Sequence, residues 1–293
     1  MIRLSGPPLD TRLREFLSED VGPSDVTTQS TVPPDRRAQG TLIARSACVV
    51  SGLAVARRAF ELLDPDLVWK EQIPVGSRVK PGETLASLSG QAQAILTAER
   101  VALNLLQRMC GIATTTRRFV DAVAGTGCRI LDTRKTAPGL RAFDREAVRD
   151  GGGVNHRDRL SDMVLIKDNH RRLAGGIANA VARARRAAPA GMTIEVEVES
   201  EQDLREALSA GADAILIDNQ TPQTVTQWCA IARATAKPPS IEASGNMNLE
   251  TVRAYAEAGP DSISVGALTH SVTAADIALD LEPITAAVTA ANR

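Results

Sequence analysis

The chain has 293 residues, of which 43% are hydrophobic and 24% charged, as in a globular protein with an apolar core. A net charge of −1 gives no general attraction to nucleic acid or to an anionic membrane, so any affinity for anions has to be local. The sequence contains neither a membrane-spanning apolar run nor a secretory signal, which predicts a cytoplasmic protein. No C-x-x-C pair occurs, which argues against a zinc site, a redox pair or a disulfide framework; the four cysteines are Cys48, Cys110, Cys128 and Cys229.

The first part of the chain mixes helical and strand-like patterns. Apolar residues at helical spacing predict helices over 9–20 and 54–63. Helices and strands in this mixed order favour an α+β domain with an antiparallel sheet. The strand-like runs are 40–44, 47–50 and the segments on either side of the turn at 80–83.

Residues 95–123 have a helical pattern, which we expect to break at Cys110-Gly111. We therefore predict the domain boundary there. An N-terminal domain is expected over 1–111 and a catalytic domain over 112–277. The C-terminal tail, 278–293, is expected to pack on the N-terminal domain.

After this boundary, short apolar strands alternate with amphipathic helices, which indicates βα units and a parallel sheet. The predicted strands are 129–132, 163–167, 193–198, 214–218, 240–243 and 262–266. The predicted helices are 177–188, 201–210, 222–234 and 249–258. About six such units without a Gly-x-Gly-x-x-Gly turn favour a closed or nearly closed barrel, with an open doubly wound sheet as the alternative.

Polar residues and glycines stand at the carboxyl ends of these strands, which in a barrel meet on the catalytic face. Alternation places Glu195, Glu197 and Glu199 on one side of their strand. At a sheet edge this would be a solvated face, but inside a barrel an unpaired carboxylate is costly and needs cations or a metal. We predict a pocket role for Glu197, the central residue. Candidate cations from neighbouring strands are Arg134, Lys135 and Lys167.

Two turns after the last strands predict a phosphate site. Ser244-Gly245-Asn246 precedes a helix expected from about Leu249, and free N–H groups at a helix N-terminus bind anions. Gly266-Ala267 makes a similar turn, and the last two βα loops of a barrel are the usual phosphate site. Either turn alone could be ordinary loop chemistry.

Three glycines precede His156-Arg157, and glycines allow the backbone to approach a ligand closely. We interpret this pair, facing Arg134 and Lys167, as a clamp for a carboxylate or phosphate. His170 and His270 are interpreted as structural, because their spacing does not fit a metal triad.

With these residues assembled, the chain resembles the quinolinate phosphoribosyltransferases over nearly its whole length. The motifs that carry the resemblance are Asp132-Thr133-Arg134-Lys135-Thr136, Pro138-Gly139-Leu140-Arg141, Ala147-Val148-Arg149, 151–157, 165–170, Glu195-Val196-Glu197-Val198, Ser244-Gly245-Asn246 and 265–271, with Glu99-Arg100, Leu103-Asn104 and 111–114 upstream. Ser24 and the pair Arg145-Glu146 depart from the family pattern, and both lie outside these positions.

The resemblance implies that quinolinate reacts with phosphoribosyl pyrophosphate to give nicotinate mononucleotide, pyrophosphate and carbon dioxide, in de novo NAD biosynthesis. It implies an N-terminal α/β sandwich and an incomplete α/β barrel, in a homodimer with shared active sites. The implied residues around the quinolinate carboxylates are Arg134, His156, Arg157 and Lys167, with Arg100 from the partner subunit. Those implied at phosphoribosyl pyrophosphate and Mg²⁺ are Lys135, Glu197 and Asp218, with Ser244, Gly245 and Gly266 near the 5′-phosphate.

Three alternatives remain at this point. A paralogue of the same fold, such as the homologue found with molybdate transport, would act on another acceptor. A Schiff-base aldolase would use Lys167 as its nucleophile. A catalytically silent binding protein would not need both the cations and the carboxylates.

Overall fold

The computed structural model describes residues 7–284, which form two compact units. Unit 1 contains the chain up to Thr114, then Ala142–Gly151, and the residues from Thr273 on. Unit 2 contains Thr115–Arg141 and Gly152–Val272. Within the described part of the chain, no helix is both long and apolar enough to span a membrane.

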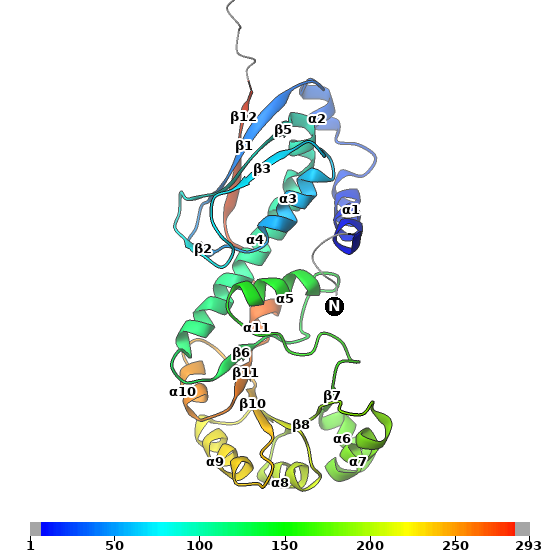
Figure 1. Ribbon diagram of the computed structural model, residues 1–293, viewed down its shortest axis with the longest axis vertical. Coiled ribbons are helices and arrows are strands. Elements are labelled where there is room, and N and C mark those ends of the chain that lie inside the picture. The colour runs from blue at the N-terminus through cyan, green and yellow to red at the C-terminus, as the bar shows by residue number, and fades with distance from the viewer. Residues whose placement is uncertain (1–6, 285–293) are drawn as a thin grey trace, which may run out of the picture. The chain divides into compact units, whose positions relative to one another are not determined.

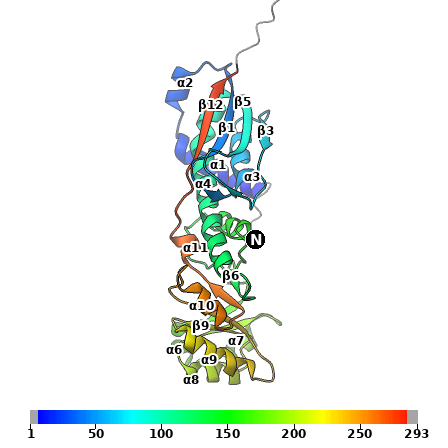
Figure 2. The same cartoon turned by 90° about the vertical axis from the view of Figure 1, so that its left-hand side faces the viewer.

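Unit 1 is built on an antiparallel sheet of four strands in the order β12-β1-β5-β3. β1 is central, paired with β5 on one side and with β12 on the other (Figure 2). A smaller sheet joins β2 to β4. The strands are β1 (Arg37–Ala44), β2 (Cys48–Val49), β3 (Val68–Glu71), β4 (Arg78–Val79), β5 (Thr84–Gln91) and β12 (Ile277–Pro283). The predicted tail therefore adds an edge strand, while its residues beyond 284 lie outside the described part.

The helices of unit 1 bury apolar side chains such as Leu13 and Phe60. An ion pair of 2.7 Å between Arg58 Nη2 and Asp10 Oδ2 joins the first and third helices. The helices are α1 (Pro7–Val21), α2 (Val26–Thr31), α3 (Leu53–Glu61), the first part of α4 (Ala92–Ala122) and α5 (Arg141–Asp150).

The expected break at Cys110-Gly111 is wrong, because α4 continues unbroken through both residues. A Cβ atom at position 111 would lie 2.2 Å from the backbone oxygen of Thr273. Glycine is needed here so that the returning chain can approach the helix closely, and the helix itself tolerates it.

Unit 2 is a parallel sheet of six strands in the order β6-β11-β10-β9-β8-β7. β6 and β7 occupy the two ends of this order and are not paired in the part of the chain that the structure describes, so the barrel is open between them. The strands are β6 (Arg129–Leu131), β7 (Val164–Ile166), β8 (Ile194–Val198), β9 (Ala214–Asp218), β10 (Ser240–Ser244) and β11 (Ser262–Ser264). The expected fold class, with its parallel open barrel, is confirmed.

Helices follow most strands of unit 2, and those from α6 to α10 pack on one another in chain order along the outside of the sheet (Figure 1). They are α6 (Asp168–Ala174), α7 (Ile177–Ala187), α8 (Glu201–Ser209), α9 (Pro222–Arg233), α10 (Val252–Glu257) and α11 (Ala267–His270). The helix expected from about Leu249 begins only at Val252. The N–H groups that directly follow Gly245 therefore belong to a turn and not to a helix N-terminus.

Candidate active site

The carboxyl ends of the strands of unit 2 surround a pocket of about 400 Å³. All six strands or the residues that directly follow them contribute to its wall, as the predicted barrel requires. The predicted site residues that line it are Arg134, Lys135, His156, Arg157, Lys167, Glu197, Asp218 and Ser244. Thr133, Leu165, Leu216, Glu242 and Ser264 complete the wall.

Two guanidinium groups lie close together in this pocket. Burial and the neighbouring charge of Arg134 lower the pKa of Arg157. The Arg157 guanidinium donates to the backbone oxygen of Met163 at 3.2 Å. Arg134 Nε is buried and has no hydrogen-bond partner among the described residues. A planar anion with several oxygen atoms would satisfy these donors and offset their repulsion.

Asp132 explains how the His156-Arg157 segment is held. The carboxylate of Asp132 is fully buried and accepts hydrogen bonds from the backbone N–H of His156 at 2.7 Å and from Asn155 Nδ2 at 2.6 Å. Val154 forms a parallel bridge with Leu131, so this segment continues the sheet beside β6. The clamp residues therefore stand on rigid backbone, although they belong to a loop.

Carboxylates and an ammonium group form another part of the pocket wall. Lys167 Nζ donates to Glu197 Oε2, which binds the end of β7 to the middle of β8. Burial raises the pKa of Asp218, and the nearby charge of Glu197 raises it further, while Lys167 and Lys135 act in the opposite direction. This half of the pocket can receive a cation, because a positive charge would offset the desolvation of the Asp218 carboxylate and its repulsion by Glu197.

A second pocket of about 480 Å³ adjoins the first and shares several residues with it, among them Lys135, Asp218 and Ser244. Gly245 lines it with φ +102°, and a Cβ there would lie 2.2 Å from Asn219 Oδ1. A Cβ at Gly266 would meet His270 Cδ2 at 3.0 Å and Lys135 Cδ at 3.2 Å. The predicted phosphate turns thus form a crowded cradle, in which Gly245 has no room for a side chain and Gly266 has room only if His270 or Lys135 shifts.

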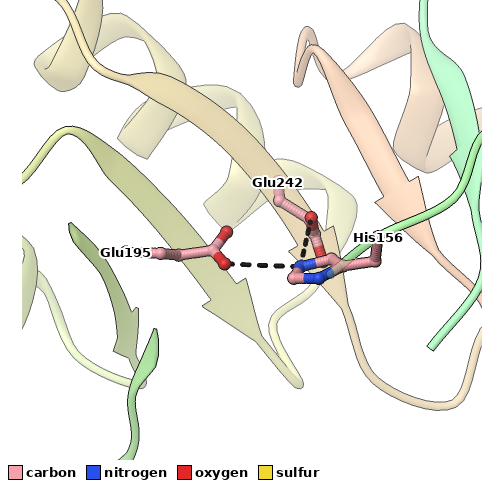
Figure 3. A group of neighbouring side chains, drawn as sticks. All are labelled: His156, Glu195 and Glu242. Carbon is pink, nitrogen blue, oxygen red and sulfur yellow. Dashed lines mark ion pairs between the residues drawn. The ribbon is translucent and has the colours of Figure 1, made fainter. Parts of the chain in front are cut away.

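His156 lies between two glutamates that the sequence analysis did not assign to the site (Figure 3). Its Nε2 is 3.3 Å from Glu195 Oε2 and 3.4 Å from Glu242 Oε2. Burial alone would lower the pKa of His156, but the hydrogen bonds and charges of both glutamates outweigh it and raise the pKa to about 10. Burial in turn raises the pKa of Glu195.

The remaining candidates lie elsewhere. Arg100 is exposed on α4 in unit 1 and lines neither pocket. Glu199 is exposed and pairs with Arg171 at 2.9 Å. His170 Nδ1 accepts the backbone N–H of Lys167 at 3.0 Å, which is a helix-capping contact, while His270 lines the second pocket.

The missed residues, Glu195 and Glu242, had a signal in the sequence. Glu242 is the single carboxylate of β10 and Glu195 is one of two in β8, in strands made otherwise of small or apolar residues, and both are buried in the structure. Glu195 enters the sequence analysis only beside Glu197, and Glu242 is passed over within the predicted strand 240–243. The sequence does not show that His156, from a distant loop, lies beside both glutamates.

Comparison with known proteins identifies the family. The family model described as "Quinolinate phosphoribosyl transferase, N-terminal domain" matches residues 25–110, and the one described as "Quinolinate phosphoribosyl transferase, C-terminal domain" matches 112–280. The chain belongs to the quinolinate phosphoribosyl transferase family. The resemblance found in the sequence is thus confirmed.

Relatives of this family agree with the chain over most of their length. A probable carboxylating nicotinate-nucleotide pyrophosphorylase of Bacillus subtilis is 43% identical over 92% of both chains. The corresponding protein of Mycobacterium leprae is 43% identical over 92% of this chain and 95% of its own. The crystal structure of NadC from Streptococcus pyogenes superposes with a TM-score of 0.91 at 36% identity, covering 97% of this chain and 100% of that one.

Proposed function

We propose that the chain is a carboxylating nicotinate-nucleotide pyrophosphorylase, which transfers a phosphoribosyl group from phosphoribosyl pyrophosphate to quinolinate. The products are nicotinate mononucleotide, pyrophosphate and carbon dioxide, in NAD biosynthesis. The observation that carries the proposal is a single pocket with cations on one side and carboxylates on the other. A pyridine dicarboxylate needs the first side, and a ribose that becomes positively charged needs the second.

Quinolinate is assigned to the side with Arg134, His156, Arg157 and Lys167. Arg134 supports this assignment most directly, since its buried Nε has no hydrogen-bond partner among residues 7–284. Guanidinium groups bind carboxylates through two parallel hydrogen bonds, so the arginine pair suits a dianion. Arg100, exposed on α4, is assigned to the quinolinate site of a partner subunit in a homodimer.

Phosphoribosyl pyrophosphate is assigned to the adjoining side. Its 5′-phosphate fits the glycine cradle of Ser244, Gly245 and Gly266, where main-chain atoms can approach an anion closely. Lys135 lines both pockets, so its ammonium group can neutralise the departing pyrophosphate. We therefore assign the ribose to the boundary between the two pockets.

Mg²⁺ fits the carboxylate side. Glu197 and Asp218 provide the oxygen ligands that this ion prefers. A cation would also offset the desolvation that raises the pKa of Asp218. These two residues would hold the ion, together with the pyrophosphate of the substrate. When bound, Mg²⁺ supplies charge neutralisation for the leaving group.

The residues of this chain perform the remaining steps. As pyrophosphate leaves, positive charge develops on the ribose, and Glu197 or Asp218 stabilises it. Arg134 and Arg157 hold the carboxylates so that the pyridine nitrogen can attack C1′. The positively charged nitrogen then stabilises the electron pair left on the adjacent ring carbon when carbon dioxide departs, and a proton from water takes the place of carbon dioxide there. Lys167, ion-paired with Glu197, connects the two halves of the site.

An assay of the purified protein tests the reaction. With Mg²⁺, quinolinate and phosphoribosyl pyrophosphate, it is expected to release equal amounts of pyrophosphate and carbon dioxide. Activity with nicotinate and none with quinolinate would overturn the proposal. A covalent adduct trapped by borohydride with a carbonyl substrate would instead favour the aldolase, which would have to break the ion pair of Lys167 with Glu197.

The shared site of the homodimer has its own test. Arg100→Ala and Lys167→Ala proteins are each expected to be inactive, and mixing them is expected to restore part of the activity in heterodimers. Confirmed subunit exchange without any recovery would count against a shared site. The cytoplasmic location, and the absence of nucleic-acid and membrane partners, stay predictions from the sequence.

A further inference from the structure

Three side chains from separate parts of unit 2 meet at one point (Figure 3), and two of them, His156 and Glu242, line the pocket. Glu195 lies on β8 and Glu242 on β10, with β9 between them. His156 arrives from the loop that Asp132 holds. The side chains are 3%, 6% and 11% exposed for Glu195, Glu242 and His156, so water screens their charges little.

Two ion pairs favour a positive charge on the imidazole of His156. Its Nε2 lies 3.3 Å from Glu195 Oε2 and 3.4 Å from Glu242 Oε2, so a proton on Nε2 faces two buried carboxylates. The pKa of His156 is raised to about 10 by these neighbours, so the ring keeps this charge at neutral pH.

The two glutamates also offset the charges of the pocket. Arg157 and Arg134 repel each other, which contributes to the lowered pKa of Arg157, whereas the charge of Glu195 acts in the opposite direction. Glu242 lines the pocket itself. Its Oε1 atom is buried and has no hydrogen-bond partner in the described part of the chain. The charge of Glu195 thus acts on both Arg157 and His156, and the charge of Glu242 acts on His156.

We infer that Glu195 and Glu242 are positioning residues of the quinolinate site, which hold the proton on His156 Nε2 and thereby orient His156 and Arg157 toward the substrate carboxylates. The inference rests on the proposed function for its substrate. The position of a proton between two carboxylates does not depend on the proposed function. Arg157 directly follows His156 on the loop that Asp132 holds, so a displacement of the ring caused by a change at either glutamate reaches the arginine through the backbone.

Imidazole NMR of the whole protein tests the inference directly, because the chain has only three histidines. The signals are assigned with His170→Gln and His270→Gln variants. In the wild-type protein, His156 is expected to keep its proton through neutral pH and to titrate near pH 10. Titration near the ordinary value of 6.5 would overturn the inference without any variant. A His156 signal that shifts when Zn²⁺ is added to the free protein would also overturn it, because the three residues would then be a metal site.

Glu195→Gln and Glu242→Gln keep the shape of each side chain and remove its charge. Each is expected to lower the pKa of His156, and the double variant is expected to lower it most. The matched control is Glu199→Gln on the same strand, whose exposed carboxylate pairs with Arg171 and not with His156. His156 should titrate in that control as it does in the wild type. Equal titration in all the variants would overturn the inference.

Kinetics separates a positioning role from a general loss of structure. Removing one of the two ion pairs of His156 is expected to raise KM for quinolinate by about 10- to 100-fold, with kcat changed less. KM for phosphoribosyl pyrophosphate should stay within about twofold, which is far below a 1.4 kcal/mol effect. An equal rise in both KM values would indicate a merely structural role. If the titration behaves as expected but the wild-type protein does not turn over quinolinate, the proposed function fails and the proton assignment stands.

Discussion

Two buried carboxylates, Asp144 in unit 1 and Glu195 in unit 2, face similar desolvation but have different partners. Burial raises the pKa of both. Asp144 is matched by Arg108 through two parallel hydrogen bonds of 2.8 and 2.9 Å, with a cation that never loses its charge. Glu195 is matched by a histidine that it shares with Glu242. The first arrangement holds a helix in place, whereas the second keeps charge available at the wall of a pocket.

The largest effect is expected at Arg134, whose charge in the pocket of unit 2 serves the substrate and not the fold. Arg134→Ala is expected to lower kcat/KM for quinolinate by on the order of 10²- to 10³-fold, because it removes donors aimed at a charged substrate. The thermal midpoint should not fall, since Arg134 Nε has no hydrogen-bond partner in the described residues. Steady-state kinetics and thermal unfolding of the same preparation measure both quantities. A large loss of stability with normal kcat/KM would reverse the assignment.

Arg108→Ala is the opposite case. It leaves the fully buried Asp144 without its cation, so the free energy of unfolding is expected to fall by about 3–5 kcal/mol. The folded fraction should keep its kcat. Denaturant unfolding followed by circular dichroism gives the stability. A loss below about 1 kcal/mol would mean that this pair resembles an exposed salt bridge.

The glycine cradle predicts a smaller effect. Gly245→Ala combines a strained φ of +102° with a close contact to Asn219, at a cost of about 1–3 kcal/mol. KM for phosphoribosyl pyrophosphate is expected to rise by on the order of 10-fold. Gly211→Ala is the matched control, because its φ is +75° and nothing lies within 4 Å of the added Cβ. Equal KM values for the two variants would show that crowding at the cradle does not matter for this substrate.

The last prediction is a pH dependence of stability. Because the pKa of His156 is raised from 6.5 to about 10 on folding, its contribution is full below about pH 6.5 and is lost as the pH rises through about 10. The difference in thermal midpoint between the wild type and His156→Gln is therefore expected to shrink between pH 7 and pH 10. A difference that stays constant over this range would contradict the raised pKa.

Much of unit 2 was predictable because its buried parallel strands are continuous apolar runs between amphipathic helices. The residues at their carboxyl ends line the pocket as expected, which follows from the parallel topology alone. Helix α5 was not predicted, since its buried residues include Asp144 and Arg145, whose partners lie elsewhere in the sequence. Gly111 was misread because its close neighbour, Thr273, is far along the chain.

The pairing of His156 with Glu195 and Glu242 could not be predicted for a related reason. The register of β8, β9 and β10 aligns Glu242 with Leu216, and Leu216 with Glu197, so Glu195 lies two residues lower. Hydrophobic patterns reveal which side of a strand faces inward, but not the level at which a loop residue enters between two strands. The two glutamates can be identified in the sequence, but their common contact with His156 cannot.

Strand β12 has a consequence for the order in which the protein is completed on the ribosome. It covers one side of β1 from Ala38 to Ala44, although it is made after all of unit 2. During synthesis, therefore, β1 presents an unpaired edge while the whole parallel sheet emerges, and exposed edges of this kind recruit other chains. Ending translation before Ile277 would leave that edge open permanently, so the final strand acts as the closure that protects a nascent chain from aggregation.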